Sequence, residues 1–117
     1  MIQAKSAAEP RHPDDGYRIL IDPEWPRGLP KGKAAGVDWM KELYPSRNLQ
    51  GWMQRNPRKR DGFRDRYMLE LASKDAAIGK VGRMHEERGT VTIVKAPQTD
   101  AWGIYDVLLS YLRATCE

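Results

Sequence analysis

One stretch of the chain decides the fold: Tyr17-Arg18-Ile19-Leu20-Ile21-Asp22-Pro23-Glu24-Trp25-Pro26-Arg27-Gly28. Its first half is aliphatic and follows a turn at Gly16, which is typical of a buried strand. Pro23 ends the strand because proline has no N–H group to donate to a neighbouring strand. The prolines that follow each fix one backbone dihedral, so the loop should be stiff. The stretch therefore predicts a buried strand that ends in a rigid loop, residues 22–28, and this loop is the first candidate functional segment.

Outward from this strand, the pattern of apolar residues predicts a second buried strand over 90–94, and residues 2–5 could add an edge strand. Strands that are joined through helices usually pair in parallel, with helices packed on the sheet. We therefore expect an α/β fold: a small parallel sheet of two to three short strands packed with about four helices. The expected helices cover about 34–43, 46–53, 61–71 and 100–112, with Ser46, Asp61 and Asp100 as caps.

The sequence also makes predictions for two tryptophans and for the segment after the third helix. Trp39 and Trp52 fall on apolar helical faces, so both are expected in the core. The segment between Gly79 and Gly89 either extends the third helix or holds a turn.

The size and composition of the chain favour a folded, well-solvated protein. With 117 residues, 40% hydrophobic and 31% charged, one domain over 1–117 is expected. The sequence contains no apolar run of about 18 residues that could span a membrane. The amino end lacks the apolar core of a signal peptide, and the single cysteine, Cys116, makes no internal disulfide. These features predict a cytoplasmic protein without a membrane partner.

Several common chemistries lack their sequence signatures. His12 and His85 have no cysteine or second histidine at the spacing of metal ligands. No glycine-rich phosphate loop follows either strand, and there is no Gly-x-Ser-x-Gly elbow. Cys116 lies beside the carboxyl end, where little can hold the geometry of a nucleophile. We therefore expect no metal site and no cofactor.

The loop after the first strand supplies a candidate binding site. If the two strands are parallel, Asp22 and Lys95 end them at one edge of the sheet, where ligands of open α/β folds bind. Arg27 could fold back over this edge, where its planar fork would hold a phosphate or carboxylate through two hydrogen bonds. Trp25 would form a wall, and Gly28 would let the backbone approach closely. These residues predict a site for a small phosphorylated or carboxylated ligand.

Other interpretations of the same residues stay open. Asp22 and Arg27 could pair with each other and Trp25 could plug the core, so that the loop only staples itself to the sheet. Asp22 and Arg27 could instead be catalytic groups of a hydrolase-like or transferase-like enzyme. A further basic stretch could meet nucleic acid or simply form a solvated surface; it consists of Arg55, Arg58, Lys59, Arg60, Arg64 and Arg66. The oligomeric state is not set by the sequence.

The stretch over 17–28 closely resembles the YeaO-like family of bacterial proteins, whose function is unknown. Members carry an Arg-Val-Leu-Val-Asp-Arg-x-Trp-Pro-Arg-Gly segment. The similarity covers nearly the whole chain and continues through these residues: Trp39, Lys41-Glu42-Leu43, Pro45-Ser46, Leu49, Trp52, Phe63, Tyr67, Glu70-Leu71, Val91-Thr92-Ile93 and Tyr111-Leu112. The resemblance implies no activity that could be transferred.

The chain departs from the family pattern at several positions. The arginine that usually follows the aspartate is Pro23 here. After the second strand the family usually has Tyr-x-Ala followed by Lys or Arg, and then an Asn-His pair. This chain has Lys95-Ala96-Pro97-Gln98 and then Gly103-Ile104. The resemblance therefore identifies a divergent member of the family.

Overall fold

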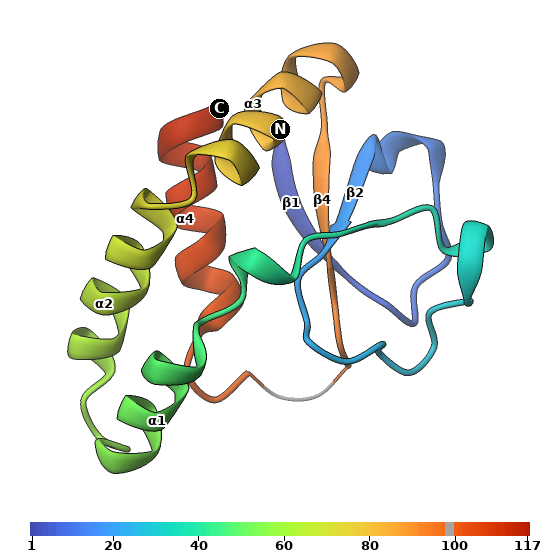
Figure 1. Ribbon diagram of the computed structural model, residues 1–117. Helices are drawn as coiled ribbons and strands as arrows, with labels where there is room; N and C mark the ends of the chain where they lie inside the picture. Colours follow the sequence, from blue (N-terminus) through green and yellow to red (C-terminus); the bar gives the residue numbers. More distant parts are fainter. Residues whose placement is uncertain (98–99) are drawn as a thin grey trace.

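A computed structural model describes residues 1–97 and 100–117, so Gln98 and Thr99 lie outside the described residues. Its centre is a sheet in which every pairing is parallel (Figure 1). In spatial order the strands are β1 (Ile2–Ser6), β4 (Val91–Lys95), β2 (Tyr17–Leu20) and β3 (Asp38–Trp39). The predicted α/β fold with a small parallel sheet is confirmed. The described sheet has four strands, because residues 2–6 join it as an edge strand and β3 adds a further one.

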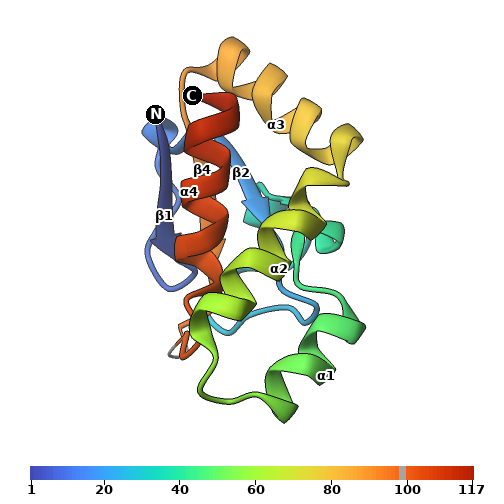
Figure 2. The ribbon, with the colours of Figure 1, turned by 90° about the vertical axis from the view of Figure 1, so that its left-hand side faces the viewer.

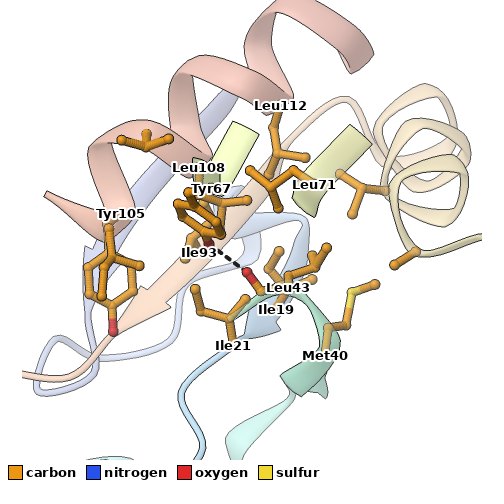
Figure 3. Packing of buried hydrophobic residues seen from close by; sticks show 14 of the residues in the cluster. Ile19, Ile21, Met40, Leu43, Tyr67, Leu71, Ile93, Tyr105, Leu108 and Leu112 are labelled. Atoms are coloured by element: carbon orange, nitrogen blue, oxygen red, sulfur yellow. Dashed lines mark hydrogen bonds between the residues drawn. The ribbon is translucent and has the colours of Figure 1, made fainter. Parts of the chain in front are cut away.

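The described residues form four α-helices, which lie on one side of this sheet (Figures 1 and 2): α1 (Arg47–Arg55), α2 (Arg60–Ala72), α3 (Asp75–Arg88) and α4 (Ile104–Cys116). Apolar residues of these helices form one buried cluster with Ile19 and Ile93 of the two central strands. Figure 3 shows part of this cluster, with Leu71 of α2 and Leu108 and Leu112 of α4. Tyr67 is fully buried and donates its hydroxyl hydrogen to the carbonyl of Leu43. The core on this face is therefore built as the helical periodicity predicts.

The opposite face of the sheet is covered by the segments that connect the strands. Leu20 and Val94 pack there against Ala7, Leu29 and Ala35. Beside this small apolar cluster lies a polar cluster, in which the Asp15 carboxylate accepts from Lys5 at 3.0 Å and from Arg18 at 3.1 Å. Asp15 and Arg18 are 3% and 5% exposed, so this ion pair is part of the interior.

The helix predicted over 34–43 is wrong. The segment forms a 3₁₀ turn over Gly32–Ala35, strand β3, and a second 3₁₀ turn over Lys41–Leu43. Gly36 adopts a left-handed conformation with φ of 60°, which ends the first turn. The strand edge of β2 then pairs with Asp38 and Trp39, which leaves Trp39 39% exposed rather than in the core. Tertiary strand pairing has overridden the apolar spacing of this segment.

The remaining elements follow the prediction with local differences. Ser46 caps α1 by accepting from the N–H group of Leu49 at 3.0 Å, as expected. Asp61 is not a cap, because α2 already begins at Arg60 and its N-cap residue is Lys59, whose side chain makes no capping hydrogen bond. The segment between Gly79 and Gly89 belongs to a separate helix, α3. Within the described residues, no helix combines the length and apolar character needed to cross a membrane.

Candidate functional site

The carboxyl ends of β2 and β4 adjoin a cavity of about 790 Å³. One wall is the loop over 22–27, and the other walls come from α1 and from the segment that leads into α4. The lining residues include the carboxylates, the cation and the large aromatic side chains that decide its chemistry: Asp22, Glu24, Asp100, Arg27, Trp25, Tyr44, Trp102 and Tyr105. The edge of the sheet that the sequence predicts as a site is therefore hollow.

Asp22 is the central polar group of this cavity. Its carboxylate accepts a hydrogen bond from the hydroxyl of Tyr105, and its backbone carbonyl accepts from Trp39 Nε1 at 2.7 Å. Burial raises the pKa of Asp22, and the nearby charge of Asp100 raises it further, against the lowering effect of the Tyr105 hydrogen bond. Asp22 is thus a half-buried carboxylate with a single side-chain donor among the described residues.

Two tyrosines set the character of the cavity wall. Burial raises the pKa of Tyr105, and the hydrogen bond to Asp22 raises it further. Burial also raises the pKa of Tyr44, to which the charges of Asp22 and Asp100 add. Both hydroxyls therefore stay protonated near neutral pH, so each can donate one hydrogen bond, and Tyr105 gives its own to Asp22. Tyr105 is held in place at the start of α4, where its N–H group donates to the Asp100 carboxylate at 2.9 Å.

Arg27 lines the same cavity and has an exposed side chain. Among residues 1–97 and 100–117, Arg27 has no ion-pair partner within 4.0 Å. The alternative in which Asp22 and Arg27 pair with each other is therefore not formed among the described residues. Three carboxylates, those of Asp22, Glu24 and Asp100, share the cavity with this guanidinium.

The sequence leaves open whether Trp25 forms a wall of the site or packs into the protein, and the structure shows both. It lines the cavity, but its Nε1 group also donates to the carbonyl of Leu29 at 3.0 Å, and its ring meets the Trp39 ring edge-on at 5.1 Å. Gly28 does not line the cavity. Gly28 has a φ of 84°, and an added Cβ would lie 3.2 Å from the Cα of Ala8. Glycine at this position therefore lets the loop pack closely against the chain after β1.

Lys95 also lies outside the cavity lining, with its Nζ 5.5 Å from the centroid of the Tyr105 ring. The structure thus brings Asp22, Trp25 and Arg27 together around one cavity, whereas Lys95 and Gly28 are not among its lining residues. Of the positions that depart from the family pattern, Pro23 and Ile104 line the cavity, whereas Gly103 forms the left-handed start of α4.

Sequence reasoning missed Tyr44, Trp102 and Tyr105 as site residues. A signal for Tyr105 was present in the sequence. Asp100 was expected to cap the helix after the second strand, and Tyr105 lies near the start of that helix, close to the edge of the sheet where the site was predicted. Tyr44 and Trp102 give no such signal, because each lies in a segment between regular elements. In the described part of the chain, no cluster of three or more His, Cys, Asp or Glu side chains is arranged to hold a metal ion.

Comparison with known proteins places the chain among relatives without an assigned activity. A family model, DUF488-N3i, described as "Inactive DUF488-N3 subclade", matches residues 1–117. The chain is 39% identical over 98 residues to "Uncharacterized protein YeaO" of Escherichia coli (strain K12), covering 84% of this chain and 85% of that protein. It is 37% identical over 84 residues to "Uncharacterized protein Rv3073c" of Mycobacterium tuberculosis (strain ATCC 25618 / H37Rv), covering 72% and 70%.

No solved structure matches the chain. The family model spans every residue from 1 to 117, and the similarity to the Escherichia coli protein extends over most of both chains. The chain therefore belongs to the YeaO-like family, within the DUF488-N3 subclade that is described as inactive.

Proposed function

We propose that the chain binds a small molecule that carries two different polar groups: an anionic group for Arg27 and a hydrogen-bond-donating group, such as an ammonium, for Asp22. The observation that carries this proposal is that Arg27 and Asp22 line one cavity of about 790 Å³ without pairing with each other. A cavity of this volume fits a small ligand.

The charges of the cavity favour a ligand of mixed charge over a plain anion. Asp22, Glu24 and Asp100 would repel a phosphate or carboxylate that entered alone, because like charges in a partly desolvated site oppose binding. A ligand with an ammonium group would instead neutralise Asp22, whose burial without a cation already costs free energy. Its carboxylate or phosphate would use the planar fork of Arg27.

Binding fits these residues better than catalysis. The hydrogen bond from Tyr105 stabilises the charged form of the Asp22 carboxylate and so weakens it as a base, while its second oxygen can still accept from a ligand. The description of the subclade as inactive agrees with a binding role. The cavity supports the proposal because a ligand could keep the hydrogen bond from Tyr105 and still contact a second oxygen of Asp22.

The experiment is a thermal-shift panel of free amino acids and phosphorylated amines, each compared with a matched acid without the amine and a matched amine without the acid. A ligand that binds only the folded state at 100 times its Kd stabilises it by about 2.7 kcal/mol. We expect this stabilisation only from compounds that carry both groups, and we expect Arg27→Ala and Asp22→Asn each to abolish it.

Lys31→Ala is the matched control, because it removes an exposed cation that does not line the cavity. It should leave the shift unchanged. An equal shift in the Arg27→Ala variant would remove the loop from the site. A larger shift from the plain acids than from the compounds of mixed charge would replace the proposal with a simple anion site.

A further inference from the structure

The positive charge of the chain is concentrated at the turn between α1 and α2. Residues 55–66 contain six cationic side chains and two acidic ones, Asp61 and Asp65, so their net charge equals the +4 of the whole chain. We call the six cations the basic hairpin: Arg55, Arg58, Lys59, Arg60, Arg64 and Arg66. We propose that the basic hairpin binds the phosphodiester backbone of nucleic acid without reading its sequence.

The side chains of the basic hairpin are exposed and unneutralised. All six belong to exposed residues. Within the described ranges 1–97 and 100–117, none of them forms an ion pair within 4.0 Å, although cations such as Lys5, Arg18 and Lys80 do. A surface of this kind gains free energy by releasing counterions when phosphates replace them.

Four of the six cations surround one hollow. Arg58, Lys59, Arg60 and Arg66 line a depression of about 480 Å³ together with Trp52, Asp61 and Gly62. The first turn of α2 lies in this depression, and the side chain of its N-cap residue, Lys59, makes no capping hydrogen bond. The backbone N–H groups of this turn add to the four cations, because the start of a helix attracts phosphate oxygens.

Trp52 fixes one of these cations in place. The guanidinium of Arg66 lies 4.1 Å from the centroid of the Trp52 ring, and its Nη1 donates to the carbonyl of Gly62 at 3.2 Å. An added Cβ at Gly62 would lie 2.8 Å from the Trp52 ring, so the ring is closely covered there as well. Trp52 therefore orients Arg66 and is not free to stack on a base, which favours contact with the backbone over recognition of bases.

The chemistry of the surface favours nucleic acid over other anionic partners. Five of the six cations are arginines, whose forks match phosphate oxygens. Duplex DNA carries one charge per about 1.7 Å of its axis, a density that suits so many cations in one hairpin. The exposed large apolar side chains among the described residues are Met1, Trp39 and Leu69. None of these belongs to residues 55–60 at the tip, where a membrane surface would need an apolar anchor.

The test is fluorescence anisotropy of a short labelled DNA duplex of mixed sequence, titrated with the full chain between about 50 and 200 mM salt. The first variant is Arg58→Ala/Lys59→Ala/Arg60→Ala. It should weaken binding at low salt by at least about ten-fold. The slope of log K against log salt concentration should become less steep by up to about 2.7, since each lost phosphate contact reduces the slope by about 0.9. A duplex of different sequence should bind wild type with the same affinity.

The matched control is Lys31→Ala/Lys33→Ala/Arg83→Ala, which removes three exposed cations outside the hairpin and changes the net charge equally. It should retain binding within about two-fold and the salt dependence of wild type. Equal losses in both triple variants would overturn the proposal, because net charge alone would then explain binding. Absence of binding at low salt would also overturn it, as would tighter binding to vesicles of anionic lipid or to a poly-glutamate peptide. Thermal melts of both variants check that they fold.

Discussion

Two aspartates flank strand β2, and the structure treats them in opposite ways. Asp15, just before the strand, is 3% exposed and shares its carboxylate between Lys5 and Arg18. Asp22, just after the strand, is half-buried beside the cavity, where its carboxylate accepts from the neutral hydroxyl of Tyr105. The first carboxylate is neutralised by the protein itself, whereas the second has no cation among the described residues.

The difference separates a structural group from a candidate binding group. Burial raises the pKa of Asp15, but the hydrogen bond from the His12 backbone and the two cations outweigh it, so the pKa is lowered overall. For Asp22 the effect of burial exceeds that of the Tyr105 hydrogen bond, so the pKa is raised. A carboxylate that stays partly desolvated without a cation costs stability, and a ligand with a cationic group would relieve that cost.

The largest expected effect is at Asp15. Asp15→Asn should lower the free energy of unfolding by about 3–5 kcal/mol, because it leaves the buried guanidinium of Arg18 without its counter-charge. Chemical denaturation at neutral pH measures this loss. Asp14→Asn is the matched control, since the neighbouring side chain is 92% exposed and its substitution should change stability by less than about 0.5 kcal/mol. A loss below about 1 kcal/mol at Asp15 would show that the ion pair does not hold this face together.

A smaller effect is expected at the other end of the strand. Tyr105→Phe should cost about 1–2 kcal/mol, because it leaves the Asp22 carboxylate without its donor. Asp22→Asn removes the unpaired charge but keeps an acceptor, so it should cost less than about 1 kcal/mol. In the Asp22→Asn background, Tyr105→Phe should cost less than it does in wild type. Additive losses in this double-mutant cycle would contradict the coupling of the two side chains.

The helix-covered face could be predicted from the sequence, whereas the loop-covered face could not. The stripes of α1, α2 and α4 follow helical spacing, and Ile19 and Ile93 mark the buried strands. The segment over 34–43 has similar spacing, but its residues Asp38 and Trp39 form strand β3, because the edge of β2 is available for pairing. That edge is a long-range property, which local periodicity does not contain.

The sequence predicts the part of the candidate site that depends on strand direction, but not the part that depends on helix packing. Asp22 and Arg27 belong to one loop, so their proximity to the sheet edge follows from strand direction alone. Lys95 ends β4 at the same edge, yet it does not line the cavity, and its Nζ lies 5.5 Å from the centroid of the Tyr105 ring. Trp102 and Tyr44 reach the cavity from segments whose positions depend on how the helices pack, and strand topology gives no information on them.

The smallest expected effect is in the pH dependence of stability, where the two aspartates should act with opposite sign. The folded-state pKa of Asp15 lies below its ordinary value of 3.8, so Asp15 stabilises the fold above that pH and loses this contribution as the pH falls through the folded-state value. The folded-state pKa of Asp22 lies above 3.8, so its contribution favours the fold at low pH and is lost as the pH rises through the folded-state value.

Denaturation of wild type, Asp15→Asn and Asp22→Asn from neutral pH down to about pH 3 separates these contributions. The stability difference between wild type and Asp15→Asn should shrink below pH 3.8, because the wild-type carboxylate then becomes protonated as well. The difference between wild type and Asp22→Asn should move in favour of wild type as the pH falls toward 3.8, since protonation removes the unpaired charge that the amide variant never carries. Parallel pH profiles for wild type and Asp22→Asn would mean that the Asp22 carboxylate is already well solvated, and the case for a ligand cation at that position would lose its physical basis.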